Sequence, residues 1–213
     1  MVAGKIAFVT GAGSGIGREV CRLLAKQGSK VIAADRNLQT AQETVDTLND
    51  SNHLALQLEV SNLSSVKEAF KSAINKYSKP PTIVVNSAAV KEMIDADVNR
   101  GSSIVNVGSI ISVNGNMGQA NYAASKAGVE ALSKTATLEF GQFGIRVNTV
   151  LPGFIETPMT DIVPDNVKQM FIKRISLRRM GKPSEVAEVI TFLASSKSSY
   201  VNGASINVTG GML

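Results

Sequence analysis

The sequence predicts a doubly wound α/β fold, in which helices cover both faces of a seven-stranded parallel sheet. Short apolar runs rich in β-branched residues alternate with stretches of helical periodicity along the chain. Most of these runs are continuously apolar, as expected for strands buried on both faces of a parallel sheet. The chain has 213 residues, 44% of them hydrophobic, and no linker or repeat divides it, so we expect one domain over residues 1–213.

Each element is predicted from its own run of residues. Strands are expected at 5–10 (KIAFVT), 30–35 (KVIAAD), 53–60 (HLALQLEV), 82–87 (TIVVNS), 102–109 (SSIVNVGS), 145–151 (IRVNTVL) and 204–210 (ASINVTG). Helices are expected at 15–27, 38–49, 62–77, 89–97, 120–141 and 183–195. The segment 152–182 breaks the alternation and is expected to be long and irregular. A long insert beyond the carboxyl end of a strand is typical of a substrate-binding loop.

The first strand runs directly into TGAGSGIG, residues 10–17, which precedes a predicted helix. Glycine allows a tight turn and lets the backbone approach a pyrophosphate, while the start of the helix offers unpaired N–H groups. A glycine turn without a ligand is the alternative, but the strand–turn–helix context favours a dinucleotide site of the Rossmann type. The residues assigned to this turn are Gly11, Gly13, Ser14, Gly15, Ile16 and Gly17.

Asp35 ends the second strand, 18 residues after Gly17. An acidic side chain near this position accepts hydrogen bonds from the ribose hydroxyls of the adenosine half. A carboxylate would repel a 2′-phosphate, so NAD(H) is the favoured cofactor. NADP(H) stays open, because the neighbouring guanidinium of Arg36 can hold a 2′-phosphate. The alternative role of Asp35 is that of a helix N-cap or turn residue.

Tyr122 and Lys126 are four residues apart in GQANYAASKAG and therefore share one face of a predicted helix. The pKa of free tyrosine is about 10, and a nearby ammonium lowers it by favouring the phenolate. The spacing alone is weak evidence, because lysine is common on helices. Ser109 strengthens it, since this residue ends a strand 13 residues upstream, where it can donate to a reacting oxygen. Tyr122 is thus a candidate general acid–base for a hydroxyl–carbonyl couple.

Five motifs, in this order, resemble those of the short-chain dehydrogenase/reductase family over essentially the whole chain: TGAGSGIG, NVGSI, NYAASKAG, IRVNTVLPGFIETPMT and the final VTGG. The resemblance implies that Ser109, Tyr122 and Lys126 belong to a catalytic tetrad and that Tyr122 and Lys126 also lie against the cofactor. It places Ile16 under the cofactor and Asp35 on the ribose. The remaining cofactor contacts that it implies are Arg36, Glu59, Val60, Asn86, Pro152, Gly153, Ile155 and Thr157.

Within the family the chain is most similar to the 3-oxoacyl-thioester reductases, a branch whose members act on 3-hydroxyacyl thioesters or on steroid alcohols. The resemblance implies an NAD-linked enzyme that interconverts a secondary alcohol and a ketone on a small-molecule substrate. It also implies a homotetramer, possibly with a related reductase subunit, in the mitochondrial matrix or otherwise the cytoplasm. The basic segment 173–182 could receive the phosphates of an acyl carrier, and a solvated cationic face is the alternative.

The sequence departs from the family pattern in three places. Ser87 and Ala89 stand where the family usually has asparagine and glycine, in the turn that closes the fourth strand. Glu59 stands where relatives usually carry an aspartate that meets the adenine amine. The largest departure follows the fourth strand, where relatives have a loop, the first half of a helix and the asparagine of the tetrad, none of which has a counterpart here. Residues 88–101 leave 14 residues for a parallel crossover, which needs a dozen or more. We therefore expect a direct crossover to be strained.

Three interpretations of this departure remain open. In the favoured one, the natural protein contains a further segment that borders the cofactor and substrate, where lids are often disordered without a ligand. In the second, the chain is truly shortened and is a weak enzyme or a nucleotide-binding partner subunit. In the third, it folds but has only a structural or regulatory role. A step between consecutive Cα atoms much longer than about 3.8 Å between Ser87 and Val90 would support the first.

Composition argues against several other functions. Cys21 is the only cysteine, so no intrachain disulfide can form and a reducing, intracellular compartment is expected. His53 is the only histidine and has no acidic cluster beside it, so no metal site is expected. The net charge of +5 is too small and too dispersed to indicate a nucleic-acid partner. No apolar stretch reaches the length that spans a bilayer.

Overall fold

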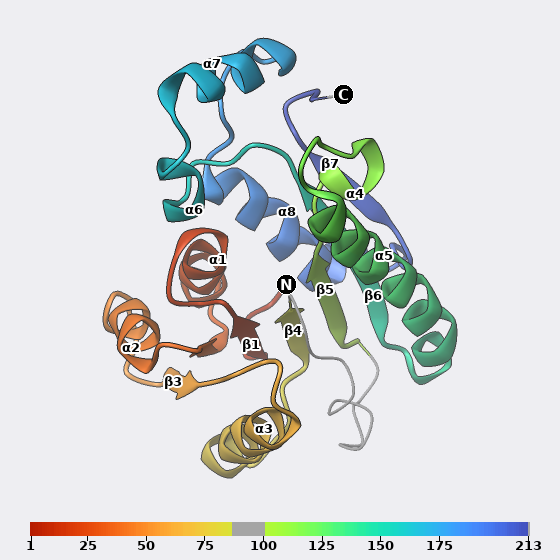
Figure 1. Cartoon of the computed structure of the whole chain (residues 1–213). Coiled ribbons are helices and arrows are strands. Elements are labelled where there is room, and N and C mark those ends of the chain that lie inside the picture. Colours follow the sequence, from red (N-terminus) through yellow and green to blue (C-terminus); the bar gives the residue numbers. More distant parts are fainter. Residues whose placement is uncertain (87–100, 213) are drawn as a thin grey trace.

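Seven parallel strands form one sheet in the order β3-β2-β1-β4-β5-β6-β7 (Figure 1). The computed structural model describes residues 1–86 and 101–212. The strands are β1 (Ile6–Thr10), β2 (Lys30–Asp35), β3 (Leu54–Gln57), β4 (Ile83–Asn86), β5 (Ser103–Val107), β6 (Arg146–Pro152) and β7 (Ser205–Val208). All seven strands match predicted runs. The strand order reverses between β1 and β4, which is where doubly wound sheets bind their ligands.

Helices cover both faces of the sheet, as the alternation predicted (Figure 1). One face carries α1 (Gly15–Lys26), α2 (Leu38–Asp46) and α8 (Pro183–Ala194), which share an apolar cluster with Ala7 and Val9 of β1. The other carries α3 (Leu63–Tyr77) and α5 (Ala120–Phe140), which share a second cluster with Ile6 and Phe8 of the same strand. Successive β1 residues therefore enter opposite cores, which explains why the run is continuously apolar.

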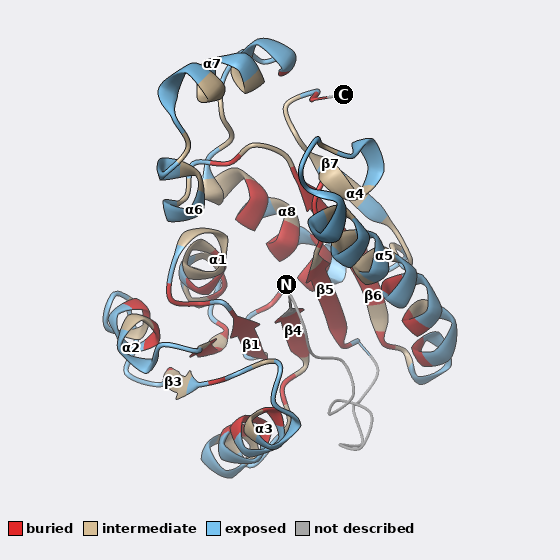
Figure 2. Ribbon diagram, in the orientation of Figure 1, coloured by how far each residue is buried: buried red, intermediate tan, exposed pale blue. Residues whose placement is uncertain are grey.

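Burial is deepest in the central strands (Figure 2). Every residue of β1 is buried, whereas β3 and β7 at the sheet edges are partly exposed. On the α3 face, the rings of Phe8 and Phe70 stack with their centroids 4.4 Å apart and their planes 11° apart. The stack fixes α3 against the middle of the sheet.

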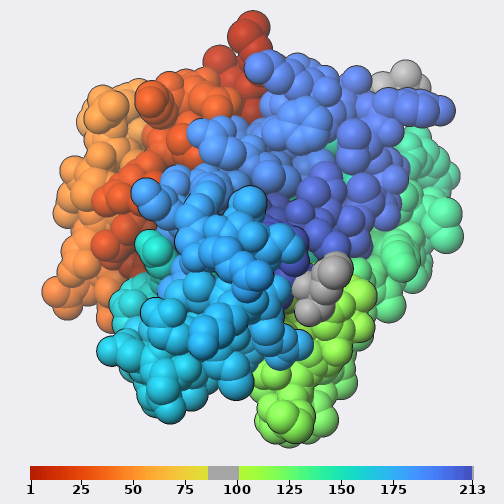
Figure 3. Space-filling model, turned by 90° about the horizontal axis from the view of Figure 1, so that it is seen from above, coloured from red at the N-terminus to blue at the C-terminus, as the bar shows by residue number. Residues whose placement is uncertain are grey.

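The predicted irregular segment 152–182 is partly helical, which corrects the sequence expectation. It contains α6 (Pro158–Asp161) and α7 (Asp165–Arg174). Local sequence features favour the N-terminus of each helix. At α6, Thr157 and Thr160 form a capping box. At α7, Pro164 precedes an acidic first turn. These two helices stand above the sheet in Figure 1, and Figure 3 shows that their segment forms part of the surface on this side.

Three short helices complete the described structure. They are α4 (Ile111–Asn114) and the 3₁₀ turns η2 (Gly141–Phe143) and η3 (Ser196–Ser198). The predicted helix 89–97 and the Cα step between Ser87 and Val90 lie outside the described residues. Within the described ranges, no helix has both the length and the apolar composition required to cross a membrane.

Candidate functional site

The predicted site residues converge on the carboxyl edge of the sheet, because parallel strands all end on the same side. The glycine turn follows β1, and Asp35 is the last residue of β2. Ser109 follows β5 by two residues, and Pro152 ends β6. Asn86 ends β4 and pairs with Asn106 in the ladder to β5. Segments separated by more than a hundred residues in sequence therefore meet along one edge.

The glycine turn leaves backbone donors free for an anion. The first amide of α1 to bond back along the helix is that of Arg18, which donates to the Ser14 carbonyl oxygen at 3.1 Å. No hydrogen bond within residues 1–86 and 101–212 uses the N–H groups of Gly15, Ile16 or Gly17. These three donors lie at the positive end of the helix dipole, so they suit a pyrophosphate.

Two glycines are required by close approach rather than by turn geometry. A Cβ on Gly17 would lie 2.1 Å from the Gly11 carbonyl oxygen, so only glycine lets α1 start this close to the turn. A Cβ on Gly153 would lie 2.9 Å from Cα of Thr209. In the turn after β1 and in the loop after β6, backbone therefore packs directly against backbone, with no room for a side chain between them.

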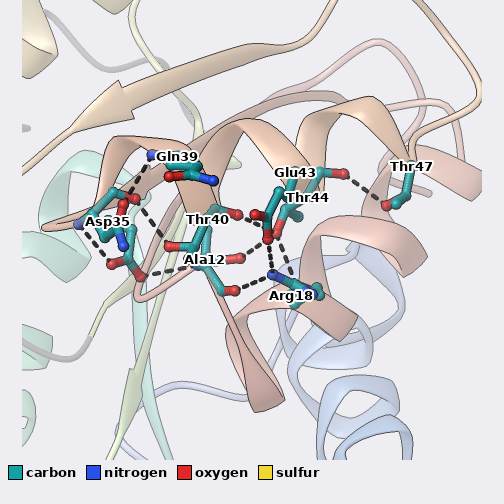
Figure 4. A network of polar contacts seen from close by, with 10 residues as sticks. Ala12, Arg18, Asp35, Gln39, Thr40, Glu43, Thr44 and Thr47 are labelled. Carbon is teal, nitrogen blue, oxygen red and sulfur yellow. Dashed lines mark hydrogen bonds and ion pairs between the residues drawn. The ribbon is translucent and has the colours of Figure 1, made fainter.

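Asp35 is tied to the glycine turn (Figure 4). Its Oδ2 accepts the Gly13 N–H at 2.9 Å, and its Oδ1 accepts the Asn37 N–H at 3.1 Å. The N-cap of α2 is Asn37, whose side chain accepts from Gln39, so Asp35 does not cap the helix. A carboxylate offers about four acceptor positions, and two remain for a ligand. The neighbouring Arg36 is exposed, with no ion pair among the described residues.

A second group of contacts holds the carbonyl side of the turn (Figure 4). The Thr44 hydroxyl of α2 donates to the Ala12 carbonyl oxygen at 2.8 Å. Arg18 of α1 contacts the Gly13 carbonyl oxygen through Nη2 and donates to the Thr44 hydroxyl through Nε at 3.0 Å. It also lies 3.5 Å from Glu43. Side chains of α1 and α2 thus hold the carbonyl oxygens of residues 12 and 13. The N–H groups of residues 15–17 remain for a ligand.

Glu59 and Val60 follow β3 at the same edge of the sheet. The exposed Glu59 carboxylate accepts the Ser61 hydroxyl at 2.7 Å and the Ser61 N–H at 3.1 Å. These two hydrogen bonds lower the pKa of Glu59. Val60 is half-buried against the α3 face of the sheet. Their contact with an adenine stays a prediction.

Tyr122 and Lys126 come together as their spacing predicted. Lys126 Nζ lies 5.8 Å from the centroid of the Tyr122 ring and donates to the Val107 carbonyl oxygen at 3.1 Å. Burial lowers the pKa of the Lys126 ammonium. Tyr122 is 37% exposed, so its side chain is accessible from solvent.

Ser109 is buried two residues after Val107, which accepts from Lys126, and its hydroxyl accepts the Ile111 N–H at 3.2 Å. In the part of the chain that the structure describes, no hydrogen bond joins it to Tyr122 or Lys126. Its hydroxyl proton is therefore not committed to either of them and suits donation to a substrate oxygen, the role predicted for it.

The loop after β6 reaches back to the glycine turn. Ile155 is buried and bridges to Gly181, and Thr157 caps α6. A Cβ on Gly15 would lie 3.3 Å from Cγ2 of Thr157, so the start of α6 lies against the start of α1. The predicted nicotinamide residues and the predicted pyrophosphate residues are thus neighbours.

The basic segment near α7 is less free than its composition indicated. Arg179 forms a bidentate ion pair with Glu185, with distances of 2.6 and 2.7 Å, and this pair lowers the pKa of Glu185 to about 2. Arg178 contacts the Lys173 carbonyl oxygen. Among the described residues, Lys173 and Arg174 have exposed side chains without an ion pair.

Sequence reasoning missed the side chains that support the site. Arg18 and Thr44 carry no motif, because a donor to a turn carbonyl is recognised only once α1 and α2 are placed in space. The same holds for Ser112 and Glu130, which contact each other between α4 and α5. Over residues 1–86 and 101–212, no three His, Cys, Asp or Glu side chains are grouped so as to hold a metal ion.

Comparison with known proteins identifies the family. Residues 5–100 match the family model described as short chain dehydrogenase, and residues 91–213 match that described as Enoyl-(Acyl carrier protein) reductase. The chain belongs to the short-chain dehydrogenase/reductase family. It is therefore an oxidoreductase that interconverts a secondary alcohol and a ketone.

Particular relatives cover nearly the whole chain. It is 40% identical to a (3R)-3-hydroxyacyl-CoA dehydrogenase of Canis lupus familiaris, over 97% of this chain and 95% of that protein. It is 38% identical to a 3-oxoacyl-[acyl-carrier-protein] reductase of Thermotoga maritima, over 99% and 98%. A solved short-chain dehydrogenase/reductase from Brucella melitensis, titled glucose/ribitol dehydrogenase, superposes with a TM-score of 0.93 at 25% identity, over 99% and 97%.

The lengths of these alignments bear on the departure after β4. The alignment to the canine protein runs over 247 positions, although this chain has 213 residues, so at least 34 positions have no counterpart here. The two family models also meet within residues 91–100. The alignment length does not say where along the chain these positions fall, so their place after β4 stays a prediction.

Proposed function

We propose that this protein is an NAD(H)-dependent oxidoreductase of 3-hydroxyacyl and 3-oxoacyl thioesters. The observation that carries the proposal is the contact of Tyr122 with Lys126 at the sheet edge that also carries the glycine turn. When bound, the nicotinamide cofactor gives a hydride to the ketone carbon or takes one from the alcohol carbon. The chain supplies the proton and the orientation.

Each catalytic residue has a distinct role in this proposal. Tyr122 gives a proton to the ketone oxygen, or takes one from the alcohol, because its 37% exposed side chain can meet a substrate. Lys126 favours the phenolate electrostatically and holds the nicotinamide ribose. Ser109 donates a hydrogen bond to the reacting oxygen.

The cofactor side supports NAD(H) over NADP(H). The Asp35 carboxylate is fixed by two backbone donors, and its remaining acceptor positions suit ribose hydroxyls. A 2′-phosphate on that ribose would meet this fixed negative charge. In the proposed site, Gly15, Ile16 and Gly17 hold the pyrophosphate, and Ile155 and Thr157 contact the carboxamide. The other predicted contacts are Gly11, Gly13, Ser14, Arg36, Glu59, Val60, Asn86, Pro152 and Gly153.

A thioester substrate is supported by the named relatives and by the exposed cations of α7. Lys173 and Arg174 are free to meet the phosphates of coenzyme A or of a carrier protein. The charge-reversing variants Lys173→Glu and Arg174→Glu should raise KM for an acyl-CoA several-fold and leave KM for a short, uncharged thioester unchanged. Equal effects on both substrates would rule out this role. Because members of the branch that the sequence resembles also act on steroid alcohols, a steroid alcohol is the alternative substrate.

The central test is turnover of acetoacetyl-CoA by the purified protein, with NADH and NADPH compared. Tyr122→Phe should lower kcat by two to four orders of magnitude, the usual contribution of a general acid. It should leave NADH affinity nearly unchanged, because the ring remains. A Tyr122→Phe variant as active as the wild type would refute the assignment.

A non-catalytic, NAD-binding subunit is the second candidate function, and the missing alignment positions favour it. The asparagine of the family tetrad has no counterpart in this sequence. Tight NADH binding without turnover of ketoacyl or steroid substrates would support this alternative.

We also propose a homotetramer, possibly with a related reductase subunit, in the mitochondrial matrix. Leu132 and Leu138 of α5 are 52% and 83% exposed, which suits a subunit contact along this helix. Light scattering after size exclusion tests the assembly, and fractionation of cells tests the compartment.

A further inference from the structure

Two side chains outside the predicted site connect the segment that carries Ser109 to the helix that carries Tyr122 and Lys126. The Ser112 hydroxyl of α4 contacts Oε1 of Glu130 on α5 and lies 2.5 Å from the Ser109 carbonyl oxygen. Ser112 and Glu130 are both half-buried. Ser112 is thus shared between the two elements of the catalytic constellation.

Glu130 lies four residues after Lys126, so the two side chains share one face of α5. Opposite charges at this spacing commonly attract each other, yet the ion pairs of residues 1–86 and 101–212 do not include this one. Lys126 instead donates to the Val107 carbonyl oxygen and lies over the Tyr122 ring. The Glu130 carboxylate could compete for the Lys126 ammonium, but it is bound by the Ser112 hydroxyl.

Among the residues that the structure describes, few titratable groups lie on the elements around Lys126. Tyr122 and Glu130 are its titratable neighbours on α5, and neither β5 nor α4 carries a titratable side chain. Burial lowers the pKa of Lys126. A carboxylate moved beside it would favour the charged ammonium and so raise this pKa.

We propose that Ser112 is a positioning residue that holds the Glu130 carboxylate away from Lys126. The inference rests on the proposed roles of Tyr122 and Lys126. A Glu130–Lys126 ion pair would neutralise the charge that favours the Tyr122 phenolate and would compete with a cofactor ribose for the ammonium. Because Ser112 binds the Glu130 carboxylate, the Lys126 ammonium stays available to the Tyr122 phenolate and to the cofactor ribose.

The test measures proton binding by Lys126 directly. A trace of acetic anhydride acetylates only neutral amines, so the extent of labelling against pH, read by mass spectrometry of the Lys126 peptide, gives a half-labelling pH. Ser112→Ala should raise this pH by about one unit or more, which is at least tenfold tighter proton binding. Ser112→Thr, which keeps the hydroxyl, and the double variant Ser112→Ala/Glu130→Gln should match the wild type. The exposed Lys134 on the same helix is the internal control.

Three outcomes would overturn the proposal. The half-labelling pH could stay unchanged in Ser112→Ala, or its shift could persist in the double variant. Glu130→Gln alone tests the same claim with Ser112 intact: the half-labelling pH should not move. A drop of a unit or more would show that Glu130 already pairs with Lys126 in the native protein.

Labelling requires no turnover, so the inference and the proposed function fail separately. A protein that shows the shift but reduces no thioester refutes only the activity. In an active protein, Ser112→Ala should also lower kcat/KM at pH 7 about tenfold, with recovery in the double variant. An active enzyme without the shift refutes only the role of Ser112.

Discussion

Gly17→Ala should destabilise the protein, although an alanine in a helix ordinarily stabilises it. Gly17 lies in the first turn of α1 with helical backbone angles, where alanine is favoured by about 0.5–1 kcal/mol. Its added Cβ, however, would lie 2.1 Å from the Gly11 carbonyl oxygen and 2.7 Å from its carbon. Both are backbone atoms, which cannot move aside by rotation of a side chain.

The magnitude follows from the displacement required. A carbon–oxygen contact needs about 3.3 Å, so α1 and the turn must separate by about 1 Å. Val20, Cys21 and Leu24 of α1 are fully buried, so the helix cannot shift without disturbing the core. Overpacking of this kind costs about 1–3 kcal/mol. We expect a net loss of about 2 kcal/mol, or about 4–8 °C in Tm for a chain of this length.

Two measurements check the prediction. Urea unfolding at fixed protein concentration gives the loss of stability, and NADH fluorescence titration should show at least a tenfold weaker Kd because the free amides of the turn move apart. Gly141→Ala is the matched control, since Gly141 is also helical and its Cβ would make an ordinary 3.6 Å contact with Asn202. Wild-type stability and NADH affinity in Gly17→Ala would refute the reasoning.

Other consequences of the structure are equally testable. Stability should fall as the pH drops below about 6.5, because burial lowers the pKa of His53, so the unfolded chain takes up a proton that the folded chain does not. Lys76 adds to this lowering and Asp50 opposes it, and urea unfolding of His53→Gln at pH 5.5 and 7.5 should show the dependence reduced. Phe70→Ala should cost about 3–5 kcal/mol in urea unfolding by removing the stack on Phe8, whereas the exposed Phe143→Ala should cost less than about 0.5 kcal/mol.

The fold could be predicted from sequence because each strand enters two cores. This makes its run continuously apolar, and the run then stands out from the helical stretches around it. The residues at which the strands end were less predictable, as β3 shows. Its apolar run extends to residue 60, but the strand ends at Gln57, which pairs with Asp35 at the end of β2. As an edge strand, β3 has no other partner with which to continue.

The site was predictable where a backbone or a helix face carries the chemistry. The glycine turn and the four-residue spacing of Tyr122 and Lys126 are local features, so the sequence alone places them. The contacts of Arg18, Thr44 and Ser112 were not predictable, since each joins elements whose relative placement depends on the whole sheet. The helix α7 is a different case, because its signals were present in the sequence at Pro164 and at the basic last turn.

The described contacts separate cofactor binding from turnover. Among residues 1–86 and 101–212, the glycine turn is held by α1 and α2, and Lys126 is held by β5. The family resemblance implies an asparagine that connects the proposed catalytic lysine to solvent, and we expect no counterpart of it in this sequence. NADH should therefore bind whether or not the protein turns over a ketone. If it binds and turnover is slow, the limiting step is proton supply to Tyr122, and a solvent deuterium isotope effect on kcat should exceed the effect of a deuterated nicotinamide. If the nicotinamide effect is the larger one, hydride transfer limits the rate and Tyr122 receives its proton without the asparagine.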